Sequence, residues 1–317
     1  MQPDDVRAQC TQIIDQIAGA VVTDRTTLET ILAGIVSDGH VLLEDVPGTG
    51  KTLTARSFAN AVGVSFKRVQ FTPDLLPSDV IGSNVFDEAT REFEFQPGPI
   101  FANVVLADEI NRAPPKTQSA LLEAMEEGQV TVDGDSYPLP DPFVVIATQN
   151  PVEMDGTFDL PVAQLDRFIV KTSLGYPDRA GELELIDRRA SRASKSPSVE
   201  RVCTLDSLNR LRSVPESVRV EAAVREYLVD VARATREDER VRTGVSPRGV
   251  QRFFEAARTR AALEGRPYAT PDDVKTMAPP VLSHRLVLTP DARIDGAAAT
   301  DIVADILSDV RVPQLSA

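Results

Sequence analysis

The chain has 317 residues, of which 26% are charged and 42% hydrophobic, a composition typical of a globular protein with about two domains. Its apolar runs are much shorter than a membrane span, and its first residues lack the basic and apolar regions of a secretory signal, so we expect a cytoplasmic protein. Its two cysteines, Cys10 and Cys203, lie far apart, which fits a reducing compartment and argues against a cysteine metal cluster.

The negative charge is concentrated in the first part of the chain. Residues 1–177 hold 11 Lys and Arg against 26 Asp and Glu, a net charge of −15, whereas residues 178–317 hold 23 against 22. An acidic region repels polyanions at long range, and no basic track stands out, so we expect no nucleic-acid partner.

Strands and helices alternate through residues 1–177. Apolar residues at helical spacing predict two helices within residues 4–36. The β-rich runs that follow, separated by helical stretches such as 51–62 and 114–127, are 41–43, 66–70, 104–107 and 143–148. This alternation predicts the α/β class, with a central parallel sheet covered by helices. Two hairpins are expected to interrupt it, one over residues 83–95 and one turning at Asp133-Gly134.

The strand signal largely disappears after Gly175-Tyr176-Pro177. Apolar residues at helical spacing then predict helices over 180–190, 222–234, 248–263 and 271–282. Ser246-Pro247 and Thr270-Pro271 place a capping residue before a proline at the first helical position. We therefore expect an α/β domain over residues 1–177 and an all-helical domain over residues 178–317.

A glycine-rich segment follows the first predicted strand. It reads Asp45, Val46, Pro47, Gly48, Thr49, Gly50, Lys51, Thr52. The N–H groups of such a turn and the helix N-terminus behind it can encircle a phosphate, while Lys51 reaches the β and γ oxygens and Thr52 ligates Mg²⁺. Asp45 replaces the first glycine of the G-x-x-x-x-G-K-[ST] pattern, so this segment alone is not decisive.

Polar residues follow two other predicted strands. Asp108 and Glu109 end one strand, where Asp108 can hold Mg²⁺ through water and Glu109 can polarise an attacking water, although adjacent acids at a strand end are also common by accident. Asn150 follows the next strand and either orients that water or caps the loop before Pro151.

Two arginines complete the set of candidate residues. Arg167 lies among apolar residues and is either an arginine finger for a phosphate or the partner of Asp166 in a salt bridge. Arg248 lies in the first turn of a predicted helix, where the helix dipole disfavours a cation by about 0.3–1 kcal/mol. We therefore expect Arg248 to face an anion.

Taken in this order, the motifs resemble those of the AAA+ ATPases, and within them the MoxR family of the helix-2-insert clade. The two hairpins resemble the helix-2 insert and the pre-sensor-1 insert. The segments that resemble Walker A, Walker B, sensor 1, the arginine-finger segment and sensor 2 are 42–52, 107–118, 147–151, 155–168 and 246–248. Asp45 replaces the first Walker A glycine, a change that the family tolerates. The chain departs from the family pattern at Val162, where the family usually has Glu, and at Thr23, where a Gly often precedes the adenine pocket.

The resemblance implies an enzyme that hydrolyses ATP with Mg²⁺. ATP would lie between the α/β core and the helical lid, with Arg248 reporting the γ-phosphate across that gap and Arg167 reaching into a neighbour's site. A finger supplied in trans requires a head-to-tail interface, so we expect a homo-oligomeric ring, most simply a hexamer.

The resemblance also implies chaperone-like remodelling, maturation or assembly of partner proteins, with clients that carry a von Willebrand factor A domain. Two alternatives stay open from the sequence. One is a chelatase-like motor that inserts a metal into a cofactor, and the other is a nucleotide-dependent scaffold whose hydrolysis is incidental.

Overall fold

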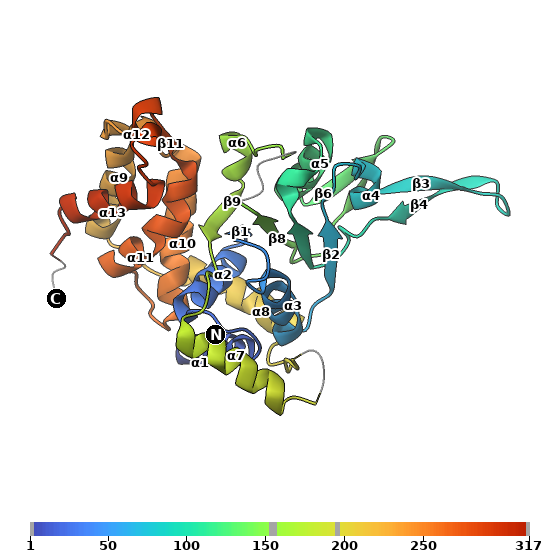
Figure 1. Cartoon of the computed structure of the whole chain (residues 1–317), viewed down its shortest axis with the longest axis horizontal. Coiled ribbons are helices and arrows are strands. Elements are labelled where there is room, and N and C mark those ends of the chain that lie inside the picture. The colour runs from blue at the N-terminus through green and yellow to red at the C-terminus, as the bar shows by residue number, and fades with distance from the viewer. Residues whose placement is uncertain (1–2, 152–156, 194–196, 315–317) are drawn as a thin grey trace.

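The computed structural model describes residues 3–151, 157–193 and 197–314 (Figure 1). The helices α1 (Pro3–Ala20) and α2 (Arg25–Val36) precede a five-stranded parallel sheet, which confirms the predicted α/β class. In spatial order, the strands of this sheet are β2 (Phe66–Gln70), β5 (Val104–Asp108), β8 (Val144–Gln149), β1 (His40–Glu44) and β9 (Phe168–Thr172). Strand β9 was not predicted. All four strand pairs are parallel, so the five carboxyl ends share one edge of the sheet.

The sheet is buried on both faces because alternate residues of its central strands pack into two different cores. Val41 and Leu43 belong to a core shared with α1, α2 and α3 (Lys51–Val62), whereas Leu42 belongs to a core shared with α5 (Pro115–Glu127). Continuous apolar runs such as Val41-Leu42-Leu43 are expected of strands covered on both sides. This packing fixes the positions of the loops at the carboxyl edge.

Both predicted hairpins are confirmed. Strands β3 (Gly82–Asp87) and β4 (Glu92–Pro97) pair antiparallel, as do β6 (Gln129–Val132) and β7 (Asp135–Pro138). The β3–β4 hairpin follows α4 (Pro77–Ile81) and extends far from the rest of the molecule (Figure 1).

The predicted helical character of the second half is also confirmed. Its helices are α7 (Arg179–Ser191), α8 (Leu205–Ser213), α9 (Ala222–Glu237), α10 (Pro247–Leu263), α11 (Pro271–Leu282), α12 (Pro290–Ile294) and α13 (Ala299–Asp309). A short antiparallel pair, β10 (Val241–Thr243) with β11 (Val287–Leu288), lies among them. The Ser246 side chain accepts a hydrogen bond from the Gly249 N–H, and Thr270 forms a capping box with Asp273, as the sequence predicts.

Helices of the second half contact α1, α2 and β9 of the core. Helix α7 contacts α1, where Arg188 donates to the carbonyl of Ala18 over 2.7 Å, and α8 packs on α2. Helix α10 packs against α2 and β9, and α11 packs against β9. The connection between β9 and α7, at residues 173–178, therefore joins the sheet to the first of these helices.

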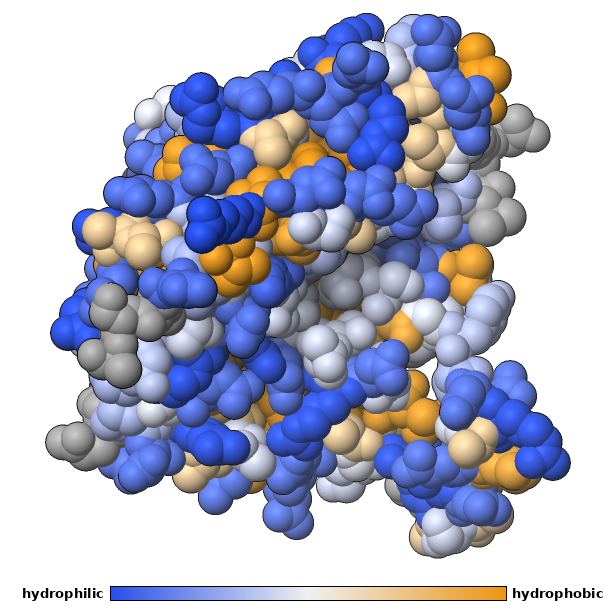
Figure 2. Space-filling model, turned by 90° about the vertical axis from the view of Figure 1, so that its left-hand side faces the viewer, coloured by the Kyte–Doolittle hydropathy of each residue, from blue (hydrophilic) through white to orange (hydrophobic). Residues whose placement is uncertain are grey.

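The largely hydrophilic surface and the two free cysteines are consistent with the composition of the chain. Seen from the side of α9–α13, the surface is largely hydrophilic, with apolar residues in small groups between polar ones (Figure 2). Among the described residues, we find no helix with the length and apolar character needed to cross a membrane. Cys10 and Cys203 are both free and buried, and burial raises the pKa of Cys10 to about 12.

Candidate active site

The glycine-rich segment forms the loop between β1 and α3. It begins after Glu44, at the carboxyl end of a strand with neighbours on both sides, and α3 begins at Lys51. Gly48 and Gly50 have φ angles of +89° and +95°, in the left-handed region that favours glycine. A Cβ added to Gly48 would meet nothing within 4 Å, so the backbone conformation requires glycine there and the space beside the loop is open. An open loop at a helix N-terminus fits a phosphate.

The Lys51 side chain folds back over this loop. Its Nζ donates to the carbonyl of Asp45 and, over 3.1 Å, to the carbonyl of Val46. Burial lowers the pKa of Lys51, and the carboxylates of Asp45, Asp108 and Glu109 act in the opposite direction. Lys51 is thus a cation held in place by loop carbonyls, and a phosphate would compete with these carbonyls for its ammonium group.

Asp108 is the last residue of β5, and both of its carboxylate oxygens are hydrogen bonded. The Thr148 hydroxyl donates to Oδ1 over 2.6 Å. Arg68 donates to Oδ2 from Nη2 over 2.6 Å and from Nε over 3.0 Å. A guanidinium therefore lies on the carboxylate that the sequence assigns to Mg²⁺.

Glu109 follows Asp108 in a left-handed backbone conformation with a φ of +57°. Non-glycine residues seldom adopt this conformation, which costs about 1–3 kcal/mol and is concentrated at functional sites. The Thr148 hydroxyl accepts a hydrogen bond from the Glu109 N–H over 2.8 Å and so holds this conformation. Gln70 Nε2 and Arg112 Nη1 both donate to Glu109 Oε2, over 2.7 and 3.1 Å.

The predicted site residues from three strands converge at the carboxyl edge. Asn150 is buried and follows β8, which lies between β5 and β1. Thr52 is the second residue of α3, so its hydroxyl and the Asp108 carboxylate supply oxygen donors of the kind that Mg²⁺ prefers. With Lys51 and the open loop, this donor set fits a nucleoside triphosphate and its magnesium ion.

Arg167 and Arg248 lie at the opposite edge of the sheet. Both bind Glu126 near the end of α5, with N–O distances of 2.9 Å. The neighbouring residue Met125 accepts a hydrogen bond from His40, the first residue of β1, through its carbonyl. The four residue steps of β1, about 13 Å at 3.3 Å per step, therefore separate Glu126 from the start of the loop at residues 45–50, called the phosphate loop. The expectation that Arg248 faces the phosphate of its own chain is not met in this structure, because α10 begins beside the amino ends of the strands.

Asp166, the alternative salt-bridge partner expected for Arg167, pairs with a different arginine. Asp166 binds the buried Arg285, whose Nε lies 2.7 Å from Asp166 Oδ1, and not Arg167. Burial lowers the pKa of Arg285 to about 10. Arg167 instead donates to the carbonyl of Leu122 as well as binding Glu126.

Among the residues that contact the predicted ones, sequence reasoning missed the polar side chains of Arg68, Gln70, Glu126 and Thr148. Arg68 and Gln70 lie two residues apart on β2, so both side chains point to the same face of the sheet. This pair of polar residues on a strand was the signal that could have identified them. Glu126 gave no signal, because only the fold brings it to the two arginines. Asp155 and Gly156, part of the arginine-finger segment, lie outside the described residues. Val162 begins the short helix α6 (Val162–Leu165) and is exposed.

Comparisons with known proteins agree with this geometry. The family profile described as "ATPase family associated with various cellular activities (AAA)" matches residues 40–170, and the "AAA lid domain" profile matches residues 233–306. The uncharacterized protein YeaC of Bacillus subtilis is 46% identical over 310 residues, which cover 98% of this chain and 97% of YeaC. Chaperone MoxR1 of Mycobacterium tuberculosis is 42% identical over 313 residues, covering 96% and 82%. A crystal structure from Cytophaga hutchinsonii superposes with a TM-score of 0.90 at 37% identity, covering 98% and 97%.

Proposed function

The chain belongs to the MoxR family of AAA+ ATPases, and on this premise we propose that it hydrolyses ATP to ADP and phosphate to drive remodelling of partner proteins. One observation carries the proposal. Lys51, Asp108, Glu109 and Asn150 converge from three strands on the open loop between β1 and α3.

Each residue at the carboxyl edge has a role in this proposal. The loop N–H groups and Lys51 would bind the phosphates, and Thr52 and Asp108 would hold Mg²⁺, which would supply positive charge to neutralise the transferred phosphoryl group. Glu109 accepts a proton from the attacking water, while Asn150 orients that water. The hydrogen bonds from Gln70 and Arg112 hold the Glu109 carboxylate in place at the carboxyl edge.

The separation of the arginines from the loop supports a shared site. Arg167 and Arg248 are held together on Glu126, at the edge of the sheet away from their own phosphate loop. A neighbouring copy in a head-to-tail ring would bring its own loop to these arginines, and a closed ring supplies every site equally. We take the ring to be a hexamer, in which each chain completes the site of the next.

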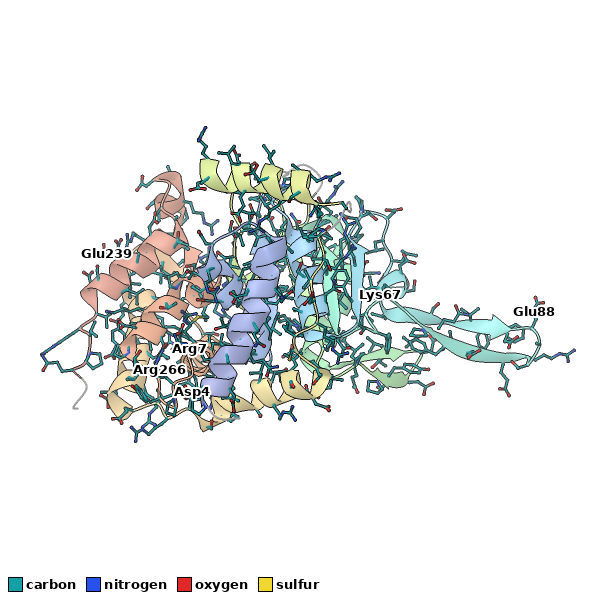
Figure 3. The ribbon with its side chains drawn as sticks, turned by 90° about the horizontal axis from the view of Figure 1, so that it is seen from below. Asp4, Arg7, Lys67, Glu88, Glu239 and Arg266 are labelled. Carbon is teal, nitrogen blue, oxygen red and sulfur yellow. The ribbon has the colours of Figure 1, made fainter. Side chains whose placement is uncertain are left out.

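The β3–β4 hairpin is the part of the chain that we propose contacts the client. Phe95 stacks on Tyr137 of the second hairpin with ring centroids 3.8 Å apart, which joins the two hairpins at the base. Farther out, Phe86 and Phe93 touch each other and are 49% and 71% exposed. Figure 3 shows the hairpin extending to Glu88, far from Lys67 on β2. The resemblance points to a client with a von Willebrand factor A domain.

The hairpin is tested by replacing both exposed rings with alanine. Phe86→Ala/Phe93→Ala protein should keep its basal ATP hydrolysis and lose most of the stimulation by an unfolded protein such as casein, because the rings supply apolar contact area. Tyr268→Ala, which removes an exposed aromatic ring in the helical region, is the matched control. Equal stimulation of the double variant and the control would remove the hairpin from client contact.

The hydrolysis itself is tested by phosphate release from purified protein. Wild-type protein should release phosphate from ATP only with Mg²⁺, and Lys51→Ala should lose nucleotide binding. Lys67→Ala, which removes an exposed lysine from β2, should retain the wild-type rate. Absence of Mg²⁺-dependent phosphate release from wild-type rings would refute the proposed activity. A Glu109→Gln variant that keeps full biological activity would instead favour the scaffold alternative.

A further inference from the structure

The side chain of Asp45 joins the phosphate loop to the segment after β9. Asp45 is 6% exposed. Its Oδ2 accepts hydrogen bonds from the N–H groups of Leu174 and Gly175, over 2.8 and 2.9 Å, and its Oδ1 accepts one from the N–H of Val46 over 2.9 Å. A buried carboxylate with three backbone donors is strongly held, because hydrogen bonds to a charged acceptor are about twice as strong as neutral ones.

The backbone of Asp45 is held on its other side. Its carbonyl accepts a hydrogen bond from Lys51 Nζ, and its N–H donates to the carbonyl of Gln149 over 3.1 Å. A phosphate that draws Lys51 away would therefore release the Asp45 carbonyl. The Asp45 carboxylate binds the N–H groups of Leu174 and Gly175, so a movement of residue 45 would also act on those two amides.

Thr23 holds the same peptide segment from a third part of the chain. Its hydroxyl donates to the carbonyl of Leu174 over 3.0 Å. Thr23 lies between α1 and α2, so the N–H and the carbonyl of Leu174 are bound by residues about 20 positions apart in the sequence. Asp45 replaces the first glycine of the Walker A pattern, Thr23 stands where a Gly often precedes the adenine pocket, and the structure brings both to Leu174.

We propose that Asp45 and Thr23 clasp Leu174 and Gly175, so that occupancy of the phosphate loop is transmitted to the connection between β9 and α7. These four residues are called the clasp. The proposal rests on the proposed function, because it requires Lys51 to exchange loop carbonyls for a phosphate. Asp45 and Thr23 are positioning residues that act through the Leu174–Gly175 backbone, and neither reacts. A glycine at position 45 would restore the motif and remove the connection.

The test measures hydrogen exchange in residues 172–181 with and without ADP, alongside the ADP dissociation constant from calorimetry. In wild-type protein, ADP should change the exchange rates of this segment. Without nucleotide, Asp45→Asn should raise exchange at Leu174 and Gly175 by about tenfold, since it weakens charge-assisted hydrogen bonds to both amides. Asp45→Gly should still bind ADP, but ADP should no longer change exchange in this segment.

Two further variants test the contribution of the Thr23 hydroxyl to the clasp. Thr23→Val removes the hydroxyl at similar side-chain volume and should raise exchange in residues 172–181 by about threefold. Thr30→Val removes a comparable hydroxyl, which donates to Thr26 within α2, and should leave the segment unchanged. A general loss of packing would raise exchange equally in all variants and in other segments, and would overturn the proposal.

The outcomes separate the clasp from the activity on which it rests. If Asp45→Gly binds ADP and the nucleotide still changes exchange in residues 172–181 as in wild type, the coupling is refuted alone. If wild-type protein binds no ADP, the proposed function and the coupling fail together. If Asp45→Gly binds ADP but ADP no longer changes hydrogen exchange in residues 172–181, the clasp is supported.

Discussion

In the proposed function, the carboxyl and amino edges of the central sheet carry two complementary groups of active-site residues. The carboxyl edge gathers Asp108 and Glu109 around the phosphate loop, whereas the amino edge gathers Arg167 and Arg248 on Glu126. As proposed, one edge holds the groups that would bind a phosphate and a metal, and the other holds cations suited to stabilising a phosphoryl transition state. The comparison teaches that the proposed groups of the site all lie on one chain but are a strand length apart.

The largest effect should come from the amino edge. Arg167→Ala should lower the rate of ATP hydrolysis by roughly 10³-fold or more, because an arginine finger supplies charge that only the transition state needs. ATP affinity should change little, which is checked by equilibrium binding of a fluorescent ATP analogue. Arg219→Ala, which removes an exposed arginine paired with Glu221, is the control for loss of surface charge. Wild-type turnover in Arg167→Ala would mean that the amino edge takes no part.

The carboxyl edge should respond almost as strongly. Glu109→Gln keeps the shape of the side chain and removes the proton acceptor, so hydrolysis should fall by about 10²-fold to 10³-fold while ATP stays bound. Single-turnover kinetics separate the chemical step from ADP release. A variant slowed only in ADP release would show that Glu109 is not the proton acceptor.

The two edges should also differ in their response to acid, because both histidines lie at the amino edge. His40 accepts a hydrogen bond from the Val145 N–H at Nδ1 and so donates from Nε2 to the carbonyl of Met125, and His284 contacts the carbonyl of Phe168. Burial lowers the pKa of His40 to about 4 and also lowers the pKa of His284. Both rings are therefore neutral in the folded protein near neutral pH.

A lowered histidine pKa contributes stability that is present above the unfolded pKa of about 6.5 and is lost as the pH falls toward the folded value. For His40 alone, the free energy of unfolding should drop by about 1.3 kcal/mol between pH 7.5 and pH 5.5. Urea unfolding at the two pH values measures the drop. His40→Asn, which can still donate and accept, should flatten the dependence. An equally steep dependence in that variant would assign the drop to other groups.

The smallest predicted effect is on the Mg²⁺ concentration that hydrolysis requires. Arg68 binds the Asp108 carboxylate, so a Mg²⁺ ion held there as proposed would compete with a guanidinium. Arg68→Ala should lower the Mg²⁺ concentration for half-maximal hydrolysis by about threefold to tenfold, since partly exposed ion pairs are worth about 1 kcal/mol. Lys67→Ala, the adjacent lysine on the other face of β2, should not shift it. A raised Mg²⁺ requirement in Arg68→Ala would show that Arg68 assists the metal instead.

Local sequence predicted the parts of the fold that depend on local chemistry. The helix from Lys51, the turn at Asp133-Gly134 and the cap at Ser246 follow from short patterns, and each is found in the structure. Strand β9 was missed because five residues, Phe168–Thr172, between irregular segments carry little periodic signal. Arg248 was correctly expected to face an anion, but that anion is Glu126, since the placement of α10 depends on packing between distant segments.

The central claim is that one chain's arginines complete the next chain's site, and mixed rings test it most directly. Arg167→Ala protein keeps Glu109, and Glu109→Gln protein keeps Arg167, so neither should hydrolyse ATP alone. In rings assembled from equal amounts of both, about a quarter of the sites should pair an intact Glu109 with an intact Arg167 from the neighbour. The account predicts recovery to about a quarter of the wild-type rate. A mixture that shows only the average of the two residual rates would contradict it.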